Sequence, residues 1–479
     1  MDLGLIAPEL VLALLGLVVL VVELFTGPGA KRLVGWVGIV GLAGALVPSS
    51  ALLGQAPRLV FGGTYAVDPF AAFFKIVAVT SGVLVLLAAM AFFRDRRAEH
   101  EGEVYVLIVF MVLGLVAMAA AADLILLFLA IEFVSLVSYV LAGSLKRDRK
   151  SSEAGVKYFL FGAVASAIML YGFSYLYGAG GTTNVYQLGP RIAGQPTSLA
   201  VVAAVLVLAG LGFKTSLVPF HQWTPDVYEG APSPVTAFLS VGSKAAAFAA
   251  LLRVFYVALP PGAWVPVLGV LAAVTMSVGN LLALSQQNVK RMLAYSAIAH
   301  AGYMMIGVVA LAASPTAVGS GIAAVLYYLL AYVFTNIGAF GVVIAAERAL
   351  GSDAIPDYAG FGRRAPVLAL AMTVFMLSLT GIPPTSLFLG KLNLFGAALQ
   401  SGLGWLAVVG ILNSAASAYY YLGVVRVMYT QAPADPSPLP EGAFIRTLLA
   451  VTAAATLVLG IYPEPFVRLV QHASLLLRV

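Results

Sequence analysis

The chain has 479 residues, of which 61% are hydrophobic and 10% are charged. Soluble domains carry about 25% charged residues, so this composition excludes an ordinary soluble protein and indicates a polytopic membrane protein. The absence of cysteine excludes thiolate-held iron–sulfur clusters and disulfides, and a net charge of +6, small for this length, reports membrane topology rather than nucleic-acid binding.

Fourteen apolar runs are each long enough to cross a membrane, which takes about 20 residues. Their predicted limits are 7–26, 33–53, 67–93, 103–121, 123–144, 154–178, 198–226, 233–259, 264–285, 290–312, 318–347, 365–397, 402–430 and 443–463. The fourth and fifth runs meet with almost no loop, around Asp123, which we expect at the membrane interface. The sequence therefore predicts an all-α membrane protein with about 14 transmembrane helices.

Lysines and arginines are distributed unevenly between the loops. Loops after odd-numbered spans carry 17 of them, whereas the opposite side carries four, namely Arg58, Arg191, Arg468 and Arg478. By the positive-inside rule, the odd loops are expected in the cytoplasm and both termini on the outer side. Lys75 and Arg253 lie near span ends and are expected to extend their charges to the interface.

Three short segments recur at similar offsets along the chain. YVLAG at 139–143 resembles YMMIG at 303–307, KYFLFGAV from 157 resembles LYYLLAYV from 326, and TSL at 215–217 recurs at 385–387. These offsets predict that spans four to eight were duplicated as spans nine to thirteen. Because five spans is an odd number, the second copy must be inverted, as in many transporters. The predicted units are 1–100, 101–260, 261–430 and 431–479, which are a three-helix segment, two repeats and a C-terminal helix.

Two spans contain helix breakers at similar places in the two copies. The seventh contains Pro219 and Pro225, and the twelfth contains Gly381, Pro383 and Pro384. Proline removes a backbone donor and clashes with the preceding turn. A break at membrane depth is tolerated only where protein or a water-filled cavity satisfies the freed groups. We therefore expect each repeat to contain a broken helix beside a polar path.

Four charged residues, Glu132, Lys214, Lys244 and Lys391, lie inside predicted spans. Each costs about 3 kcal/mol on insertion scales, which favours a function in moving protons or ions. Lysine suits this role because its proton can be released, whereas arginine stays protonated. The structural alternatives are a helix–helix seam for Glu132, a static pair with Glu132 for Lys214, and backbone-bonded lysines for Lys244 and Lys391.

Two histidines are candidate relay residues because the unperturbed pKa of histidine lies near 6.5. His221 follows Lys214 by seven residues, and His300 lies in the tenth span; a buried structural histidine is the alternative for each. Further polar residues could line a hydrated path or simply pack, and they are Tyr139, Tyr303, Tyr327, Tyr328, Thr335 and Asn336. Asp226 and Glu229 are expected to cap adjoining helix ends. The sequence contains no phosphate loop, dinucleotide fingerprint or metal-ligand cluster.

Three motifs resemble those of a known family. The segment KTSLVPFHQWTPDVYEGAPSPVTAFLSVGSKAAAFAALLR from Lys214 to Arg253 resembles the central motif of the antiporter-like membrane subunits of respiratory complex I. VKRMLAYSAIAHAGYMMIG and LTGIPPTSLFLGKLNLF match that family in the same order, and the resemblance covers roughly residues 100–430. Within the family, the lysine pattern is most similar to the subunit N branch.

The resemblance implies a proton-translocating subunit of NADH-quinone oxidoreductase that holds no cofactor, in a bacterial plasma membrane. Glu132 would pair with Lys214, which would be loaded from the cytoplasm; Lys244 would join a central hydrophilic axis, and Lys391 would pass the proton outward. The implied partners are the other membrane subunits of the complex and the lipid bilayer. Quinone would act only indirectly, through the complex.

Other assignments remain open at this point. A freestanding or Mrp-type cation/proton antiporter would use the same buried charges. A structural subunit would hold them as inert ion pairs. Subunits of related thylakoid or hydrogenase complexes would differ in their electron donors, which this chain does not contact.

Overall fold

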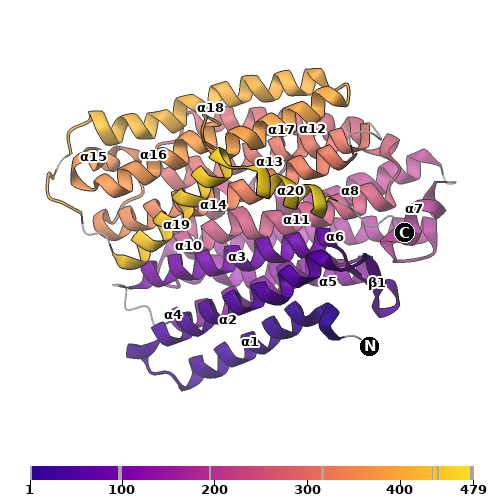
Figure 1. Ribbon diagram of the computed structural model, residues 1–479, viewed down its shortest axis with the longest axis horizontal. Helices are drawn as coiled ribbons and strands as arrows, with labels where there is room; N and C mark the ends of the chain where they lie inside the picture. Colours follow the sequence, from indigo (N-terminus) through magenta and orange to yellow (C-terminus); the bar gives the residue numbers. More distant parts are fainter. Residues whose placement is uncertain are drawn as a thin grey trace.

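The structure is a computed structural model that describes residues 3–94, 100–193, 196–313, 318–433, 435–439 and 442–474. Arg96, Arg97 and Arg478, which contribute to the predicted charge asymmetry, lie outside the described residues. Within the described part, thirteen helices are long and apolar enough to cross a membrane. Figure 1 shows them as one bundle of roughly aligned helices, with α1 at one edge and α18 at the other.

The elements follow in chain order. The α-helices and strands are α1 (Ala7–Phe25), α2 (Arg32–Ala51), β1 (Arg58–Val60), β2 (Tyr65–Val67), α3 (Pro69–Phe93), α4 (Glu101–Ala120), α5 (Leu124–Ala142), α6 (Arg149–Gly180), α7 (Val185–Ile192), α8 (Thr197–Thr215), α9 (Trp223–Gly230), α10 (Ser233–Phe238), α11 (Lys244–Arg253), α12 (Val265–Ala283), α13 (Val289–Ala313), α14 (Val318–Leu350), α15 (Phe361–Arg364), α16 (Pro366–Thr380), α17 (Ser386–Gln400), α18 (Gly404–Thr430), α19 (Ala443–Ile461) and α20 (Glu464–Ala473). Two π-helical turns, Leu239–Ser243 and Val254–Ala258, flank α11, and short 3-10 turns occupy Leu3–Ile6, Pro28–Ala30, Leu52–Gly54, Phe61–Gly63, Pro261–Ala263 and Ile355–Tyr358.

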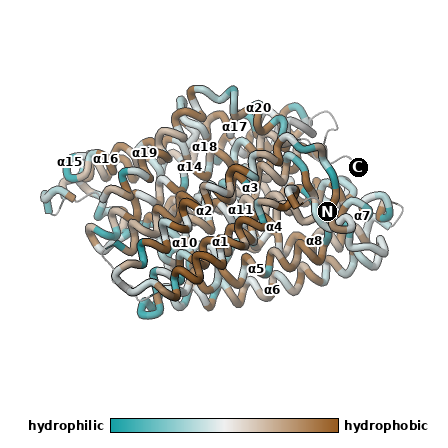
Figure 2. The backbone as a smooth tube through the Cα atoms, turned by 60° about the horizontal axis from the view of Figure 1, so that its bottom comes forward, coloured by the Kyte–Doolittle hydropathy of each residue, from teal (hydrophilic) through white to brown (hydrophobic). Residues whose placement is uncertain are grey.

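The predicted fold class is confirmed, and most span limits agree to within a few residues. The ninth span is α12, and the short junction between the fourth and fifth spans runs from the end of α4 to the start of α5. Asp123 is buried at this junction as the N-cap of α5, where its carboxylate accepts hydrogen bonds from the amides of Ile125 and Leu126. Figure 2 shows hydrophobic colouring along most of each long helix and hydrophilic colouring at the ends of the bundle.

Both predicted helix breaks are present. The seventh span ends as α8 at Thr215, where Ser216 adopts a φ of 64°, and continues as α9. The twelfth span ends as α16 at Thr380, where Gly381 adopts a φ of 88°, and continues as α17. Each break contains a cis peptide bond, Val218–Pro219 in the first and Pro383–Pro384 in the second.

The two breaks correspond at one common offset. Ser216 and Gly381 differ by 165 positions (381 minus 216), and so do Pro219 and Pro384 (384 minus 219). The TSL match does not follow this correspondence, because TSL at 215–217 ends the helix before the first break, whereas TSL at 385–387 begins the helix after the second. The broken helices therefore correspond in backbone geometry, and the TSL repeat is a coincidence of composition.

Lys75 and Arg253 do not extend their charges to the interface, so that expectation is wrong. Lys75 is fully buried, 2.9 Å from a Glu9 carboxylate oxygen and 2.7 Å from the Tyr65 hydroxyl. Arg253 is 1% exposed and pairs with buried Asp68 at 2.9 Å. Both cations find carboxylates supplied by the N-terminal 70 residues. A buried partner satisfies each charge inside the bundle, so neither side chain has to reach water.

Several small elements lie outside the predicted spans. β1 and β2 form an antiparallel hairpin in which Arg58 faces Val67. α20 packs against α3 and α14, and the His472 imidazole lies 2.8 Å from the Leu53 carbonyl oxygen. Figure 1 shows α20 crossing the front of the bundle. The hairpin lies at the end of the bundle at which α3 begins (Figure 1).

Candidate functional site

Glu132 lies on α5 and is partly buried against α6. Its carboxylate accepts a hydrogen bond from the Ser166 hydroxyl. Ser135, on the same face, donates to the Ile131 carbonyl at 2.6 Å rather than to a neighbouring helix. Among the described residues, Glu132 therefore makes one hydrogen bond across to α6, and it remains partly buried.

Lys214 lies in the last turn of α8 and is 3% exposed. Its ammonium has no hydrogen-bond partner among the described residues. The Tyr158, Tyr139 and Phe213 rings surround it, with their centres 5.4, 5.8 and 5.9 Å from Nζ. Glu132 acts on Lys214 electrostatically, but the two form no ion pair within 4.0 Å. A static pair with Glu132 is therefore absent from this part of the chain.

Lys244 is the first residue of α11 and directly follows a π-helical turn. It is 1% exposed, and its Nζ donates to the Ala297 carbonyl on α13 at 2.5 Å. π-helical turns often occur at functional sites. The bond to a backbone carbonyl is the contact expected under the structural alternative for this lysine.

His300 lies one turn after Ala297 on α13 and is 1% exposed. Its ring nitrogens lie 2.6 Å from the Tyr328 hydroxyl and 3.1 Å from the Tyr421 hydroxyl. Lys244 and Lys391 both act on this imidazole electrostatically. His300 therefore stands between the two lysines and is hydrogen-bonded on both sides.

Lys391 lies on α17 and reaches back across the second break. Its Nζ donates to the carbonyls of Leu379 at 3.0 Å and Thr380 at 2.8 Å, and to the Ser414 hydroxyl at 2.8 Å. The carbonyls belong to the last turn of α16, where the helix dipole favours a cation. At Gly381, an added Cβ would lie 2.8 Å from the Lys391 Cδ, so this close approach needs glycine.

Five of the six predicted site residues fall into two linked groups, which together we call the series. Glu132 acts electrostatically on Lys214, and Lys244 and Lys391 both act on His300. His221 lies in the first break, partly buried, and its Nδ1 has no partner among the described residues. No hydrogen bond joins it to Lys214. The structure therefore does not join His221 to the series.

The other predicted polar residues divide into two groups. Tyr139, Tyr303 and Tyr328 contact the series, whereas Tyr327 donates to the Leu459 carbonyl and Thr335 bonds Ser378 and Thr456. Sequence reasoning missed contact residues that read as ordinary packing or helix-surface residues, namely Tyr158, Ser166, Ser240, Ser414 and Tyr421. Of these residues, only Ser240 could have been identified from the sequence, because it precedes Lys244 by four residues.

Buried polar atoms without a partner cluster along the series. In the described residues they include the hydroxyls of Tyr139, Tyr158, Tyr228, Tyr332 and Ser243, and the Asn336 side-chain oxygen. Most buried polar groups are hydrogen-bonded to protein or to ordered water. Such a run of free donors and acceptors beside lysines can bind water molecules and carry protons between the charged groups.

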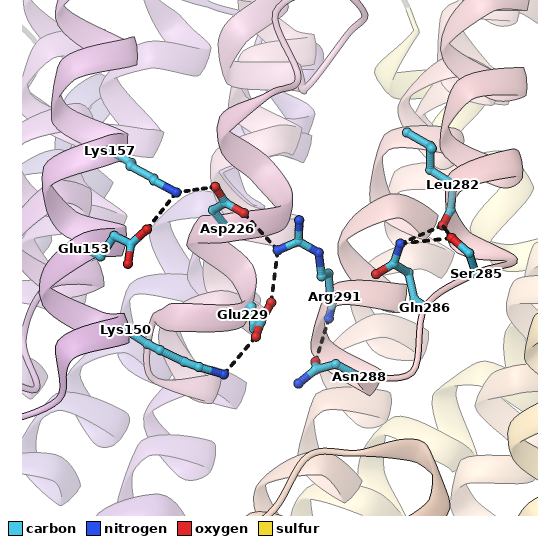
Figure 3. A network of polar contacts seen from close by, with 10 residues as sticks. All are labelled: Lys150, Glu153, Lys157, Asp226, Glu229, Leu282, Ser285, Gln286, Asn288 and Arg291. Atoms are coloured by element: carbon cyan, nitrogen blue, oxygen red, sulfur yellow. Dashed lines mark hydrogen bonds and ion pairs between the residues drawn. The ribbon is translucent and has the colours of Figure 1, made fainter.

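The half-helix α9 is held at one end of the bundle by a network of ion pairs, drawn in Figure 3. Asp226 lies 2.6 Å from Lys157 and 2.8 Å from Arg291, and Glu229 lies 2.9 Å from Lys150 and 3.0 Å from Arg291. The expectation that these acids cap helix ends is wrong, because cations on α6 and α13 lie within reach of both.

The network sets the charge of its acids. Burial alone would raise the pKa of the Glu229 carboxyl, but hydrogen bonds from Lys150 and Arg291 outweigh burial, and this pKa is lowered. Glu229 is therefore ionised at neutral pH and keeps both cations paired.

Comparisons with known proteins show the family to which the chain belongs. Residues 121–417 match the family described as NADH:quinone oxidoreductase/Mrp antiporter, transmembrane. NADH-quinone oxidoreductase subunit N of Trichlorobacter lovleyi is 43% identical over 480 residues, covering 98% of this chain and 97% of the relative.

Solved structures agree as well. A chain in the structure of respiratory complex I from Thermus thermophilus with bound aureothin is 35% identical, with a TM-score of 0.82 over 96% of this chain and 98% of that chain. A chain of the Mrp complex from Dietzia is 23% identical with a TM-score of 0.85, covering 99% of this chain and 97% of that chain, and shows the same fold. The chain belongs to the NADH:quinone oxidoreductase/Mrp antiporter family of membrane subunits, among relatives named subunit N.

Proposed function

We propose that this chain is the proton-translocating subunit N of a membrane-bound NADH-quinone oxidoreductase. The full-length similarity to relatives with that name supports the assignment. The chain supplies proton-carrying side chains and no redox group, and quinone reduction in other subunits drives it. In this assignment, its partners are the other membrane subunits, and it meets quinone only through the complex.

The single observation that carries the proposal is the environment of Lys214, a buried lysine whose Nζ has no hydrogen-bond acceptor in the described part of the chain. A buried ammonium is stabilised only when it is paired or hydrogen-bonded. Lysine can lose its proton, so this site suits an amine that alternates between two charge states. Glu132 supplies the nearby negative charge that favours proton uptake.

The remaining residues extend the path. A proton released from Lys214 passes by the Tyr158 and Tyr228 region to Lys244, then by His300 to Lys391. His300 accepts and donates through its two tyrosine partners. Lys391 is the last group, because it is held at the end of α16 by carbonyls that favour its charged form. His221 serves as a relay only if the chain segment between α8 and α9 changes conformation.

The chain lies in a bacterial plasma membrane with both termini on the outer side in this proposal. The excess of basic residues in the odd loops supports that orientation. The ion-pair network of Figure 3 then lies at the cytoplasmic end, and Lys214 is loaded from that side.

The test is Lys214→Met in the intact complex, purified and reconstituted into liposomes. We expect normal assembly and a loss of proton translocation per NADH oxidised. The matched control is Lys31→Met, which removes a lysine paired with Glu23 at the bundle edge and should leave translocation unchanged. Unchanged translocation in an assembled Lys214→Met complex would establish the alternative of an inert structural subunit.

The Mrp-type antiporter is the second candidate, because the Dietzia complex has the same fold. Purification separates the two candidates. The proposal expects the chain to co-purify with flavin-containing and iron–sulfur subunits. Isolation with membrane antiporter subunits alone, together with sodium-dependent proton exchange, would favour the antiporter.

A further inference from the structure

Polar residues form a stripe on the eighth span that ends at Lys244 of the proposed path. Ser233, Thr236, Ser240 and Lys244 follow at spacings of three, four and four, which places them on one helix face. All four are buried. This stripe runs from the end of the bundle that carries the Figure 3 network down to Lys244.

The outer end of the stripe opens into a pocket of about 230 Å³. Its lining includes Ser233, Lys290, Glu347 and Asp353. The Ser233 hydroxyl lies 2.8 Å from both carboxylate oxygens of Glu347, so an acid from α14 meets the first hydroxyl of the stripe. The Glu347 side chain is 12% exposed and is the acid that joins the pocket to α10.

Near Lys244, the inner end of the stripe contacts polar residues of α14. The Asn336 amide donates to the Ser240 hydroxyl at 2.6 Å, one turn before Lys244. The Asn336 side-chain oxygen and the Tyr332 hydroxyl, also on α14, have no partner among the described residues. The π-helical turn Leu239–Ser243 widens the helix between Ser240 and Lys244. These groups can bind water between the stripe and the lysine.

We propose that Glu347 takes protons from the pocket and passes them along the stripe to Lys244, so that Lys244 is loaded from the pocket as well as from Lys214. The inference rests on the proposed function. Each transfer moves one proton and no electrons. Glu347 accepts a proton from a hydronium ion in the pocket. The Thr236 and Ser240 hydroxyls, which donate to the Tyr228 and Ala237 carbonyls at 3.1 and 2.7 Å, rotate so that each accepts a proton and donates its own. The neutral Lys244 amine then becomes an ammonium.

The competing interpretation is that Glu347 only pairs with Lys290. Their closest N–O distance is 3.4 Å, whereas Lys290 donates to the Ala231 carbonyl at 2.8 Å. Both Glu347 oxygens instead meet Ser233 at 2.8 Å. The carboxylate is thus held more closely by the stripe than by the lysine. Other charged groups that face the pocket are Asp148, Lys150, Glu229 and Asp353.

The experiment compares Glu347→Gln and Glu347→Asp in the intact complex in liposomes, with Asp357→Asn as the control. Asp357 is an exposed acid in the turn after α14 that bonds Ser352. We expect Glu347→Gln to remove the pocket's share of the proton supply to Lys244, so that the initial rate of proton translocation falls and the remaining rate depends on Lys214. Glu347→Asp should retain translocation with a shifted pH profile, and Asp357→Asn should behave as wild type.

Ser240→Val gives an independent measurement that leaves the Lys290 pair intact. The methyl groups remove the hydroxyl and fill the space that a replacing water would need, so translocation should fall as in Glu347→Gln. If Glu347→Gln fails to assemble, Ser240→Val decides. Wild-type translocation in an assembled Glu347→Gln or Ser240→Val complex would overturn the inference. Failure of Lys214→Met to lower translocation would instead overturn the proposed function, so the two failures are distinguishable.

Discussion

The ammonium of Lys391 lies 2.8 Å from the carbonyl oxygen of Thr380, the last residue of α16. The Lys391 side chain, from the helix after the break, thus donates to the last carbonyl of the helix before the break. Within the residues that the structure describes, Lys214 has no such partner, although it lies beside the corresponding break. The two lysines therefore differ in what holds them, and they should respond differently to substitution.

Lys391→Met should abolish proton translocation and also destabilise the subunit. The buried Leu379 carbonyl loses its donor, at a cost of about 1–3 kcal/mol, whereas the Thr380 carbonyl keeps the Ser414 hydroxyl at 3.1 Å. The measurement is the melting temperature of the purified complex together with translocation in liposomes. Ser414→Ala removes one acceptor and keeps the amine, so it should translocate normally. Wild-type translocation in Lys391→Met would contradict the assigned role.

Gly381→Ala should disturb the same site through the backbone. Alanine at a φ of 88° costs about 1–2 kcal/mol, and its Cβ would lie 2.8 Å from the Lys391 Cδ. We expect a lower melting temperature and slower translocation. Gly396→Ala on α17 is the control, because nothing lies within 4 Å of its added Cβ and the helix gains about 0.5–1 kcal/mol. Equal effects in both variants would argue against the contact.

The buried pair of Arg253 and Asp68 should contribute strongly to assembly. Arg253→Met leaves a carboxylate that is 0% exposed without its cation, which costs about 3–5 kcal/mol. The double variant Arg253→Met with Asp68→Leu should recover most of that loss. Arg468→Ala breaks an exposed pair with Glu464 and should cost under about 1 kcal/mol. Thermal melting of the four complexes decides, and no recovery in the double variant would refute the pairing.

The ion pairs of Glu229 predict a pH dependence of stability. Because its pKa is lowered in the folded chain, the carboxylate stabilises the fold above the usual glutamate pKa of about 4.3. This contribution disappears as the pH falls through the lower folded-state pKa. Glu229→Gln should therefore melt at a lower temperature than wild type at pH 7. The difference should shrink towards pH 3, and a constant difference would contradict the argument.

The limits of the spans could be predicted because apolar runs of about 20 residues have one common solution in a membrane. The breaks could be predicted from proline, since Pro219 and Pro384 cannot continue a helix unchanged. The hairpin at 58–67 was not, because its strands are three residues long and have no clear alternation of polar and apolar residues.

The partners of charges were the main failure of sequence reasoning. A cation near a span end has the same sequence signature whether it reaches water or meets a buried acid. Asp68 lies 185 residues from Arg253, so no local pattern joins them. Glu132, Lys214, Lys244 and Lys391 were identifiable because each lies in the middle of an apolar run. Tyr158 was not, because tyrosine packs without a special role in most helices.

When the two breaks are aligned by their common offset of 165 positions, Lys391 corresponds to Asp226 (391 minus 226). Asp226 bonds Lys157 and Arg291 at the end of the bundle, whereas Lys391 bonds the backbone of α16. The two breaks thus share one backbone geometry but carry charges of opposite sign at the corresponding position. A chimera in which the first broken segment replaces the second would therefore keep the broken helix and lose Lys391.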